Sequence, residues 1–523
     1  MLKSNFITAM AKGFTVLLIT SVMQILALAP LQAATPGKEI SDKDITSAVE
    51  DGLMFEKGMI PYEVDVSTNQ GIVTLSGSVG NILAKERLIK IAESIRGVRG
   101  TIDRITVTQV SRPDADIRQD ILSALHQDPA TESYQVSASV KEAMATLTGG
   151  VGSYYEKQLA ARIAKGVSGI KDLRNEIAVN YAAKRTDSEI EADVKSRLQW
   201  DIWINGDLIV PSVKDGNVML NGISGSSIGK SRAAEDAWVN GVISVDNRGI
   251  MVEPWMNKDT HRKSKFAIRS DNDIKQALLA VFRLDPRVSA FSPDVAVEEG
   301  EVDLRGVVGN LKAKIAAEQD AKNITGVSRI HNLLKVRLQA QPTDADIRNQ
   351  LKAALSWDPL LFKDSTIKVA VVNGVASLWG TVNTNYQWTQ AQDIASRTKG
   401  VVQVQNYLKI EPDYSTGYFD WPDIASYDYG LANYIQPPYR VPGTIEPQMY
   451  LSDEQIKKDI EKNFFWSPFV ARDDITVAVN EGVATLTGTV GTWIGWREAD
   501  KDAHKSGAIK VVNRIKVKRG AWF

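Results

Sequence analysis

Residues 482–491 read GVATLTGTVG, a run of alternating small and apolar residues enclosed by glycines. Close variants recur along the chain: GIVTLSGSVG at 71–80, GNVMLNG at 216–222, GEVDLRGVVG at 300–309, GVASLWGTV at 374–382, and AMATLTG at 143–149, where Ala143 replaces the first glycine. Period-two alternation after a glycine predicts a β-hairpin whose second strand is half buried. Six occurrences of one motif indicate a chain built from internal repeats.

An amphipathic helix is predicted upstream of each copy. Apolar residues stand at positions i, i+4 and i+8, as in Ile347, Leu351 and Leu355, and form one stripe that faces a core. Five of these helices follow a Ser or Thr, with an acid or glutamine three residues later, which is typical of a helix N-terminus. The helix isoleucine precedes the hairpin glycine position by 26 residues in five copies and by 27 in the fifth. This register predicts six repeats of about seventy residues.

Each repeat is predicted to run helix, strand, strand, helix, strand. We therefore expect an α+β fold of six tandem α-β-β-α-β repeats, each packing two helices on a small three-stranded sheet. The first glycine of each motif is expected to supply a positive φ in the hairpin turn, and the second to let the chain leave the sheet without a β-carbon clash. These structural glycines are Gly71, Gly77, Gly216, Gly222, Gly300, Gly306, Gly374, Gly380, Gly482 and Gly488.

This combination of motifs resembles the BON domain, a family named for bacterial osmotically inducible periplasmic proteins and nodulation proteins. The matching motifs are an Asp-Pro after the first helix (128–129, 285–286, 358–359), the G-x-V-x-L-x-G hairpin, and a closing G-V-x-x-V-x-N-x-L-x-V, as in GVSRIHNLLKV at 326–336. The resemblance implies a non-catalytic periplasmic or envelope protein that contributes to envelope integrity or osmotic-stress tolerance; several such proteins bind phospholipid. The family's lipid-contacting residues lie outside the shared motifs, so the resemblance assigns none here.

The first 33 residues have the layout of a cleaved secretory signal peptide. Lys3 and Lys12 precede a largely apolar run over 14–29, and Ala33 and Ala34 follow; a retained membrane anchor is the alternative. The mature protein is predicted to reach the periplasm, with an extracellular or membrane-associated location as the alternatives. The predicted divisions are the signal peptide 1–33, repeats at 41–110, 113–181, 186–255, 270–337, 343–410 and 452–519, a basic linker at 256–269 and an aromatic, proline-rich strap at 411–451.

Composition and motif content argue against an enzyme. The chain has no cysteine, which excludes disulfides and thiolate metal sites, and its four histidines share no ligand spacing. It lacks the signatures of phosphate-binding loops, nucleophile elbows and zinc proteases. Residues 1–33 hold two lysines and no acid, so their removal takes the net charge from −1 to −3, which does not attract nucleic acid. We predict no catalytic residue, metal, cofactor or nucleic-acid partner.

Aromatic residues cluster after the first helix in the third, fifth and sixth copies. These stretches read LQWDIWINGD from 198, LSWDPLLFKD from 355 and NFFWSPFVARDD from 463. Rings beside charges suit a membrane interface, whereas packing against the next repeat is the structural alternative. Because no repeat follows the sixth, Phe465, Trp466 and Phe469 are predicted to bind lipid or a partner, while Phe464 belongs to the core stripe.

Two connecting segments carry further candidates. In the linker, Lys258, Arg262, Lys263 and Lys265 form either a solvated loop or a contact with anionic lipid headgroups. The strap contains seven of the fourteen tyrosines of the chain and is expected to pack as an ordered segment across adjacent repeats. The alternative is an interaction surface in which Tyr418, Trp421 and Tyr429 stack on a glycan or contact a partner protein.

The sequence thus predicts a non-enzymatic, exported envelope protein. Its predicted partner is an anionic phospholipid surface, bound peripherally, or another envelope component, in support of envelope integrity and osmotic-stress tolerance. The alternative is a structural protein that self-assembles into homo-oligomers or filaments, or a protein–protein scaffold. Six similar surfaces in one chain favour multivalent binding in either case, because weak contacts add through effective concentration.

Overall fold

A computed structural model of the chain describes residues 40–54, 64–108, 111–253, 269–338, 342–361, 366–410, 451–470 and 475–517. The chain divides into two units, Met1–Ile40 and Ser41–Phe523, and the second contains all the repeats, which we number one to six. Some of the residues singled out from the sequence lie outside the described part: the signal peptide 1–33, Lys258, Arg262, Lys263 and Lys265 of the linker, and Tyr418, Trp421 and Tyr429 of the strap.

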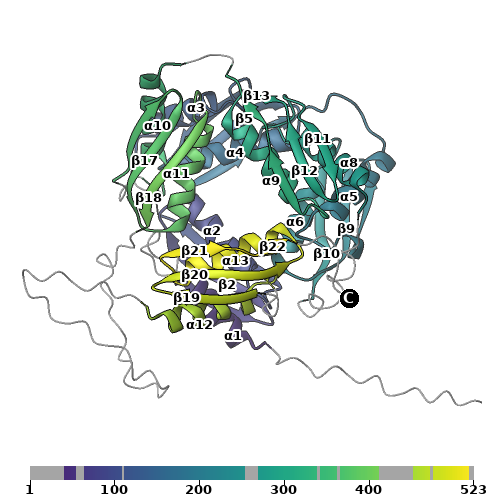
Figure 1. Cartoon of the computed structure of the whole chain (residues 1–523). Helices are drawn as coiled ribbons and strands as arrows, with labels where there is room; N and C mark the ends of the chain where they lie inside the picture. The colour runs from purple at the N-terminus through teal and green to yellow at the C-terminus, as the bar shows by residue number, and fades with distance from the viewer. Residues whose placement is uncertain are drawn as a thin grey trace, which may run out of the picture. The chain divides into compact units, whose positions relative to one another are not determined.

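One order of elements recurs along the second unit (Figure 1). Repeats one to three contain α1 (Asp42–Met54), β1 (Val64–Asn69), β2 (Ile72–Val79), α2 (Ile82–Glu93), β3 (Gly100–Val107); α3 (Asp114–Gln127), β4 (Gln135–Lys141), β5 (Met144–Val151), α4 (Tyr154–Lys165), β6 (Asp172–Asn175), β7 (Ala178–Val179); and α5 (Asp187–Trp200), the 3-10 helix η2 (Gly206–Leu208), β8 (Ile209–Lys214), β9 (Asn217–Ser224), α6 (Ser227–Asp236), β10 (Ser244–Val252). Repeats four to six contain α8 (Asp271–Leu284), β11 (Asp294–Glu298), β12 (Glu301–Arg305), β13 (Val307–Val308), α9 (Leu311–Lys322), β14 (Arg329–Asn332), β15 (Lys335–Val336); α10 (Asp344–Trp357), β16 (Lys368–Val372), β17 (Val375–Val382), α11 (Asn385–Arg397), β18 (Gln403–Ile410); and α12 (Asp453–Trp466), β19 (Ile475–Asn480), β20 (Val483–Val490), α13 (Trp493–Lys505), β21 (Lys510–Asn513), β22 (Lys516–Val517). The predicted α-β-β-α-β order is confirmed.

The second strand of each repeat lies in the centre of a three- or four-stranded sheet, and in repeat four the short β13 and β15 form a separate pair. In repeat five, β17 pairs antiparallel with β16 and parallel with β18. A parallel pair needs a crossover, and the second helix of the repeat provides it. In repeats two, four and six the third strand is divided into two short pieces. Both pieces pair parallel with the second strand, which in repeat four is itself divided into β12 and β13.

The predicted apolar stripe of each first helix is buried. Ile347, Leu351 and Leu355 of α10 join Ala376 and Leu378 of β17 in one core cluster with residues of α11. Both helices therefore cover the same face of the sheet, and alternate residues of the central strand point away from the core. Phe464 is 1% exposed, which confirms that it belongs to the core.

An aspartate at the first position of each first helix fixes the hairpin turn. Oδ2 of Asp344 accepts the backbone N–H of Asn373 at 2.8 Å, and Oδ1 accepts that of Gly374 at 2.9 Å. The helix N-terminus also favours a negative charge at this position. The same pair of hydrogen bonds is made in all six repeats, by Asp42, Asp114, Asp187, Asp271, Asp344 and Asp453. The sequence motif predicts capping by the residue two positions later, such as Asp346, but it does not predict this contact with the turn.

The two glycines of the hairpin motif serve different purposes. The first has the predicted positive φ, for example 74° at Gly374, and Ala143 of repeat two adopts 61° without a glycine. The second lies inside the central strand in five repeats and between β12 and β13 in repeat four, so the prediction that it lets the chain leave the sheet is wrong. The predicted β-carbon clash is confirmed at Gly149, Gly222 and Gly380. Gly222 pairs with Ile209 of β8, and a β-carbon there would lie 2.0 Å from the carbonyl oxygen of Leu208. At Gly222, close approach of the two strands is what requires glycine.

Candidate functional site

Three repeats end their first helix in a tryptophan, and each of these tryptophans contacts another repeat. The carbonyl oxygens of Trp200, Trp357 and Trp466 each accept a backbone N–H at 2.9 Å. The donors all precede the positive-φ glycine before the third strand of their own repeats, and they are Thr325, Ser168 and Arg96, respectively. The same main-chain contact therefore joins repeat three to four, two to five, and one to six.

This pairing corrects two expectations from the sequence. Packing against the next repeat along the chain holds for Trp200 of repeat three, but Trp357 of repeat five contacts repeat two. The end of α12 in repeat six was expected to lack a neighbouring repeat, because none follows it in sequence. Repeat one occupies that place, because the partner is set by contacts between distant parts of the chain.

The three aromatic residues predicted as a binding site in repeat six differ in exposure. The ring of Phe469 packs edge-to-face on Trp203 of repeat three, with ring centroids 5.1 Å apart. Trp466 is half-buried beside repeat one. Phe465 is 41% exposed, lies edge-to-face on Trp466, and has the guanidinium of Arg96 at 5.5 Å from its centroid. Of the three rings, Phe465 is thus the one most available at the surface.

A cavity between repeats one and six lies beside these rings. Its walls include Lys462, Lys501, Lys505, Asp51, Glu498, Asp502, Trp466 and Phe469. Lys462 pairs with Asp51 at 2.7 Å, and Lys501 pairs with Glu498 at 3.0 Å. Burial disfavours the charge on Glu498, but the neighbouring cations Lys501 and Arg497 outweigh this effect and hold the pKa of Glu498 below its usual range. Two lysine charges on the wall are therefore compensated by Asp51 and Glu498.

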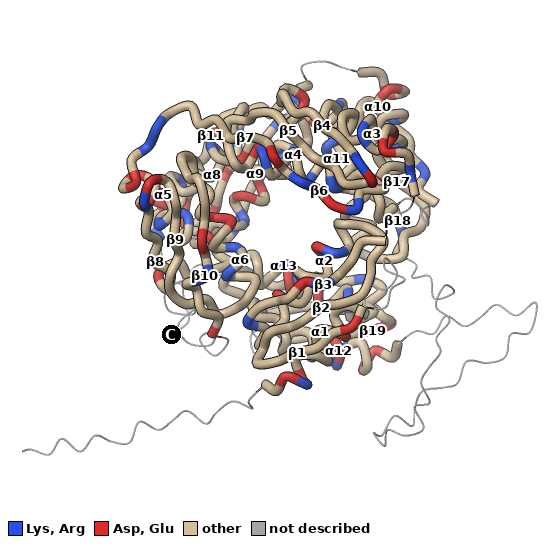
Figure 2. Tube along the Cα trace, turned by 180° about the vertical axis from the view of Figure 1, so that it is seen from behind, with Lys and Arg blue, Asp and Glu red and all other residues tan. Residues whose placement is uncertain are grey.

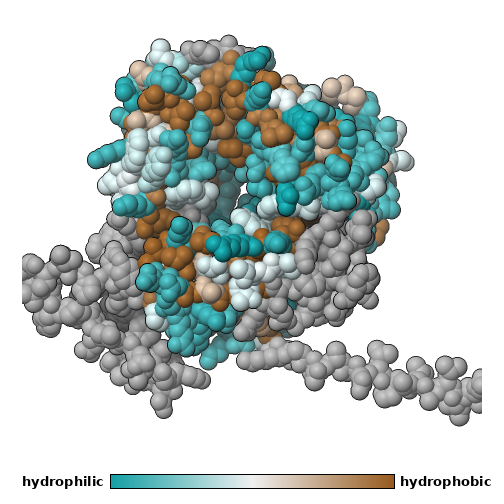
Figure 3. All heavy atoms as spheres, viewed as in Figure 1, coloured by the Kyte–Doolittle hydropathy of each residue, from teal (hydrophilic) through white to brown (hydrophobic). Residues whose placement is uncertain are grey.

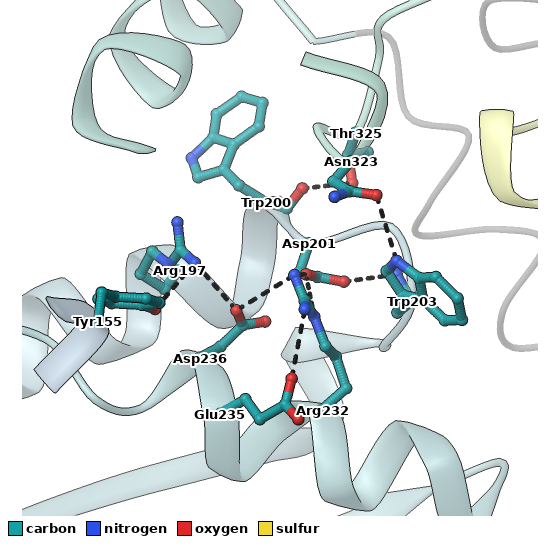
Figure 4. A network of polar contacts seen from close by, with 10 residues as sticks. All are labelled: Tyr155, Arg197, Trp200, Asp201, Trp203, Arg232, Glu235, Asp236, Asn323 and Thr325. Atoms are coloured by element: carbon teal, nitrogen blue, oxygen red, sulfur yellow. Dashed lines mark hydrogen bonds and ion pairs between the residues drawn. The ribbon is translucent and has the colours of Figure 1, made fainter. Parts of the chain in front are cut away.

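A buried polar network links repeat three to repeats two and four (Figure 4). Arg232 Nε donates to Asp201 at 2.9 Å. Arg197 donates to Asp236 at 3.1 Å and to the hydroxyl of Tyr155, from repeat two, at 3.2 Å. Burial, together with the nearby Asp201, raises the pKa of Asp236 to about 7.

Two carboxyl groups with separated pKa values are also found at acid–base catalytic sites. Here Asp201 and Asp236 are 6% and 1% exposed, so a substrate does not reach them. The indole N–H of Trp203 donates to the side chain of Asn323, from repeat four, at 3.3 Å beside the same network. We interpret the network as a contact that holds three repeats together.

The second helix carries a buried or half-buried acid at one position in repeats three, four and six. Each acid precedes a fully buried alanine: Asp236, Asp320 and Asp502, where the other repeats have Ile91, Ile163 and Ile394. One carboxyl oxygen of each acid is buried and is reached by no donor of the described chain. Burial raises the pKa of all three carboxyls. The sequence analysis missed them, although an acid within an apolar helix stripe is a readable signal.

Charge distribution, metal-ligand geometry and helix length can be read from the described repeats. Basic and acidic residues are interspersed over the repeats (Figure 2). Within the described ranges, no group of three or more His, Asp or Glu is placed to hold a metal ion. No helix in the part of the chain that the structure describes is long and apolar enough to cross a membrane.

A pair of exposed aromatic residues on repeat five was also missed. Trp379 of β17 and Tyr407 of β18 are 41% and 54% exposed on the sheet face opposite the helices. Their ring centroids lie 6.0 Å apart and the ring planes differ by 14°. The signal was present in the repeated motif, where GVASLWGTV places a tryptophan at an outward-facing strand position.

Tandem α-β-β-α-β units that pair through their helix ends define the class as a repeat protein of small α+β domains. The profile of the BON domain matches residues 41–109, 113–181, 186–252, 270–337, 343–412 and 452–519, so the chain belongs to the BON domain family. The resemblance noted in the sequence is thereby confirmed.

Two known proteins provide the comparisons. Osmotically-inducible protein Y of Escherichia coli (strain K12) is 27% identical over 148 residues, which cover 27% of this chain and 74% of that protein. Two solved chains of CdsD, a structural protein of the type III secretion system of Chlamydia trachomatis, match with 16% identity and a TM-score of 0.12. The matches cover 40% of this chain and 92% of the first, and 41% of this chain and all of the second, a C-terminal domain.

Proposed function

We propose that the mature chain is an exported, periplasmic protein that binds anionic phospholipid surfaces and supports envelope integrity under osmotic stress. Family membership indicates an envelope-associated protein. The relative named for osmotic induction supports the link to osmotic stress. The proposal assigns no reaction and no cofactor to the chain.

The observation that carries the lipid proposal is the exposed ring of Phe465 beside basic side chains. Arg96 lies against the ring and donates through Nη1 to the carbonyl oxygen of Phe465 at 3.3 Å. Lys462, one turn before Phe465 on α12, is exposed although it pairs with Asp51. A ring and cations at one surface suit the headgroup region of a bilayer, where both find favourable surroundings. On the face drawn in Figure 3, apolar residues reach the surface among hydrophilic ones.

Two separable contributions to binding are expected. Insertion of Phe465 contributes roughly 1–2 kcal/mol from the apolar area that it buries. Lys258, Arg262, Lys263 and Lys265 of the linker contribute through charge, at about 1 kcal/mol for each residue near an anionic surface. The charge contribution weakens as salt shortens the screening length below about 8 Å.

The test is co-sedimentation of the mature protein with vesicles of anionic or neutral phospholipid, at low and high salt. Phe465→Ser should weaken binding to anionic vesicles at both salt concentrations, and replacement of the four linker residues by glutamine should remove most of the salt dependence. Val210→Ser is the matched control, because it removes an exposed apolar side chain from repeat three. Wild-type protein that does not co-sediment with vesicles, but sediments alone as large assemblies, would refute the proposal in favour of a self-assembling scaffold.

A further inference from the structure

The outer face of the repeat-five sheet, which we call the open face, carries an aromatic pair across its strands. Trp379 of β17 is the register partner of Lys368 on β16 and of Tyr407 on β18. These three residues form one row on the side opposite the buried Leu378. Trp379 and Tyr407 are nearly parallel, and Tyr407 Oη lies 3.4 Å from Oε1 of Gln405 on the same face.

The aromatic pair is not required by the fold. Trp379 follows the fully buried leucine of the central strand, and the corresponding residues of the other repeats are Ser76, Thr148, Asn221, Arg305 and Thr487. Tyr407 follows the polar residue near the start of the third strand, and its counterparts are Arg104, Glu176, Arg248, Leu333 and Arg514. Only repeat five combines two rings at these positions, although all six repeats form the same sheet. Exposed rings that contribute little to folding indicate a binding surface.

The charge of the open face is positive. Lys368 and Lys409 are exposed on it, and uncharged polar residues such as Ser377 and Gln405 are half-buried beside them. Among the outward-facing positions of β16, β17 and β18 there is no acid. The corresponding face of repeat four is different, because Glu301 and Asp303 point outward there.

We propose that the open face of repeat five is a docking surface for an anionic phospholipid bilayer. Trp379 and Tyr407 would lie at the level of the headgroups, where rings with a polar edge are favoured, and Lys368 and Lys409 would contact the phosphates. This inference rests on the proposed function and adds a second contact to that of Phe465, in a different repeat. Two weak contacts on one chain strengthen each other through effective concentration.

The absence of cysteine allows a site-specific test in the full mature chain. Ser377→Cys places one thiol on the open face, next to the aromatic row, for labelling with an environment-sensitive nitrobenzoxadiazole fluorophore. Thr485→Cys is the matched control, because it occupies the equivalent position on the sheet of repeat six. Anionic vesicles should shift the emission of the Ser377→Cys conjugate to the blue and leave that of the Thr485→Cys conjugate unchanged.

Substitutions test the same surface without a label. Trp379→Ser combined with Tyr407→Ser should weaken binding to anionic vesicles by about tenfold or more, and Lys368→Gln combined with Lys409→Gln should do the same mainly at low salt. Met219→Ser removes an exposed apolar residue from the outer sheet face of repeat three and should leave binding unchanged.

The outcomes separate this inference from the proposed function. A wild-type chain that does not sediment with any vesicle refutes both. A chain that sediments in a Phe465-dependent manner, while the Ser377→Cys probe and the double variants show no change, refutes the inference alone. Variants that bind vesicles normally but lose retention on insoluble peptidoglycan would also overturn it, and would assign the open face to a glycan. If the double variants fold poorly, the labelled Ser377→Cys chain still decides the question.

Discussion

Replacing Gly149 by alanine should destabilise repeat two far more than replacing Gly306 should destabilise repeat four. Both residues occupy the second glycine position of the hairpin motif, and both have a positive φ, 128° and 118°. They differ in the space around them. A β-carbon on Gly149 would lie 2.1 Å from the carbonyl oxygen of Gln135, whereas the nearest atom to a β-carbon on Gly306 is 3.9 Å away.

The expected magnitudes follow from this difference. The conformational cost of a positive φ is common to both variants and amounts to roughly 1–3 kcal/mol. In Gly149→Ala the start of the hairpin must also open, where Gln135 pairs with Gly150 and Val136 with Gly149. Loss of two backbone hydrogen bonds adds roughly 1–3 kcal/mol. We expect about 1–3 kcal/mol for Gly306→Ala and about 2–6 kcal/mol for Gly149→Ala, the latter being a large part of the roughly 4–10 kcal/mol typical of a domain this size.

Hydrogen exchange of the intact chain, followed by mass spectrometry, measures both effects locally. Peptides from β4 and β5 should lose far more protection in Gly149→Ala than peptides from β11 and β12 lose in Gly306→Ala. Gly152→Ala is the control in repeat two, because its φ is not positive and a β-carbon there would meet no atom within 3.4 Å. Equal losses in the two variants would refute the steric argument, and no loss in either would refute the requirement for glycine altogether.

Three further predictions concern the turn, the buried network and pH. Gly374→Val should lower the free energy of unfolding by about 1–2 kcal/mol or more, since φ is 74° and a β-carbon would lie 3.0 Å from the carbonyl oxygen of Gly400; an unchanged melting temperature would contradict this. Arg232→Met should cost about 3–5 kcal/mol in urea unfolding, because the buried carboxylate of Asp201 loses its partner; adding Asp201→Asn should recover part of the loss, and a double variant no more stable than the single one would argue against that cause. Burial raises the pKa of Asp502 to about 7 in the folded chain from the ordinary 3.8, so the stability it contributes at low pH is lost as pH rises through this window. Asp502→Asn should therefore reduce the fall in urea midpoint between pH 5 and pH 8, and parallel pH profiles for variant and wild type would exclude Asp502 as the cause.

The features that the sequence predicted correctly depend on short-range patterns. The stripe of Ile347, Leu351 and Leu355 and the turn at Gly374 are set by residues within one element or one turn, where periodicity and backbone geometry decide. The register between copies then fixed the element order. The sequence motif also predicted the position of the closing asparagine, but not its contact. Asn406 donates to the carbonyl oxygen of Trp388 at 3.1 Å and so links the third strand to the second helix.

The features that the sequence analysis missed depend on contacts between distant residues. Asp344 binds a turn that lies 30 residues further along the chain. An acid at a helix N-terminus is already explained by the helix dipole, so the sequence offers no reason to expect the second contact. The neighbour of Trp466 is repeat one, which chain order alone does not suggest. Asp236 is paired with Arg197 of α5 and Arg232 of its own helix, so these buried ion pairs depend on how the two helices pack, although an acid within an apolar helix stripe can be recognised in the sequence. Trp379 differs from these contacts, because its outward-facing position can be recognised within the motif GVASLWGTV.

The contacts made by the three tryptophans also impose an order on synthesis. They join the third repeat to the fourth, the second to the fifth and the first to the sixth, so the pairs are nested along the chain. As the polypeptide emerges from its N-terminus, the innermost pair is the earliest that can close and the outermost the latest. Repeat one must wait for the first helix of repeat six before Arg96 can meet Trp466. A chain that ends early therefore leaves its earliest repeats without partners, which distinguishes an incomplete product from a finished one.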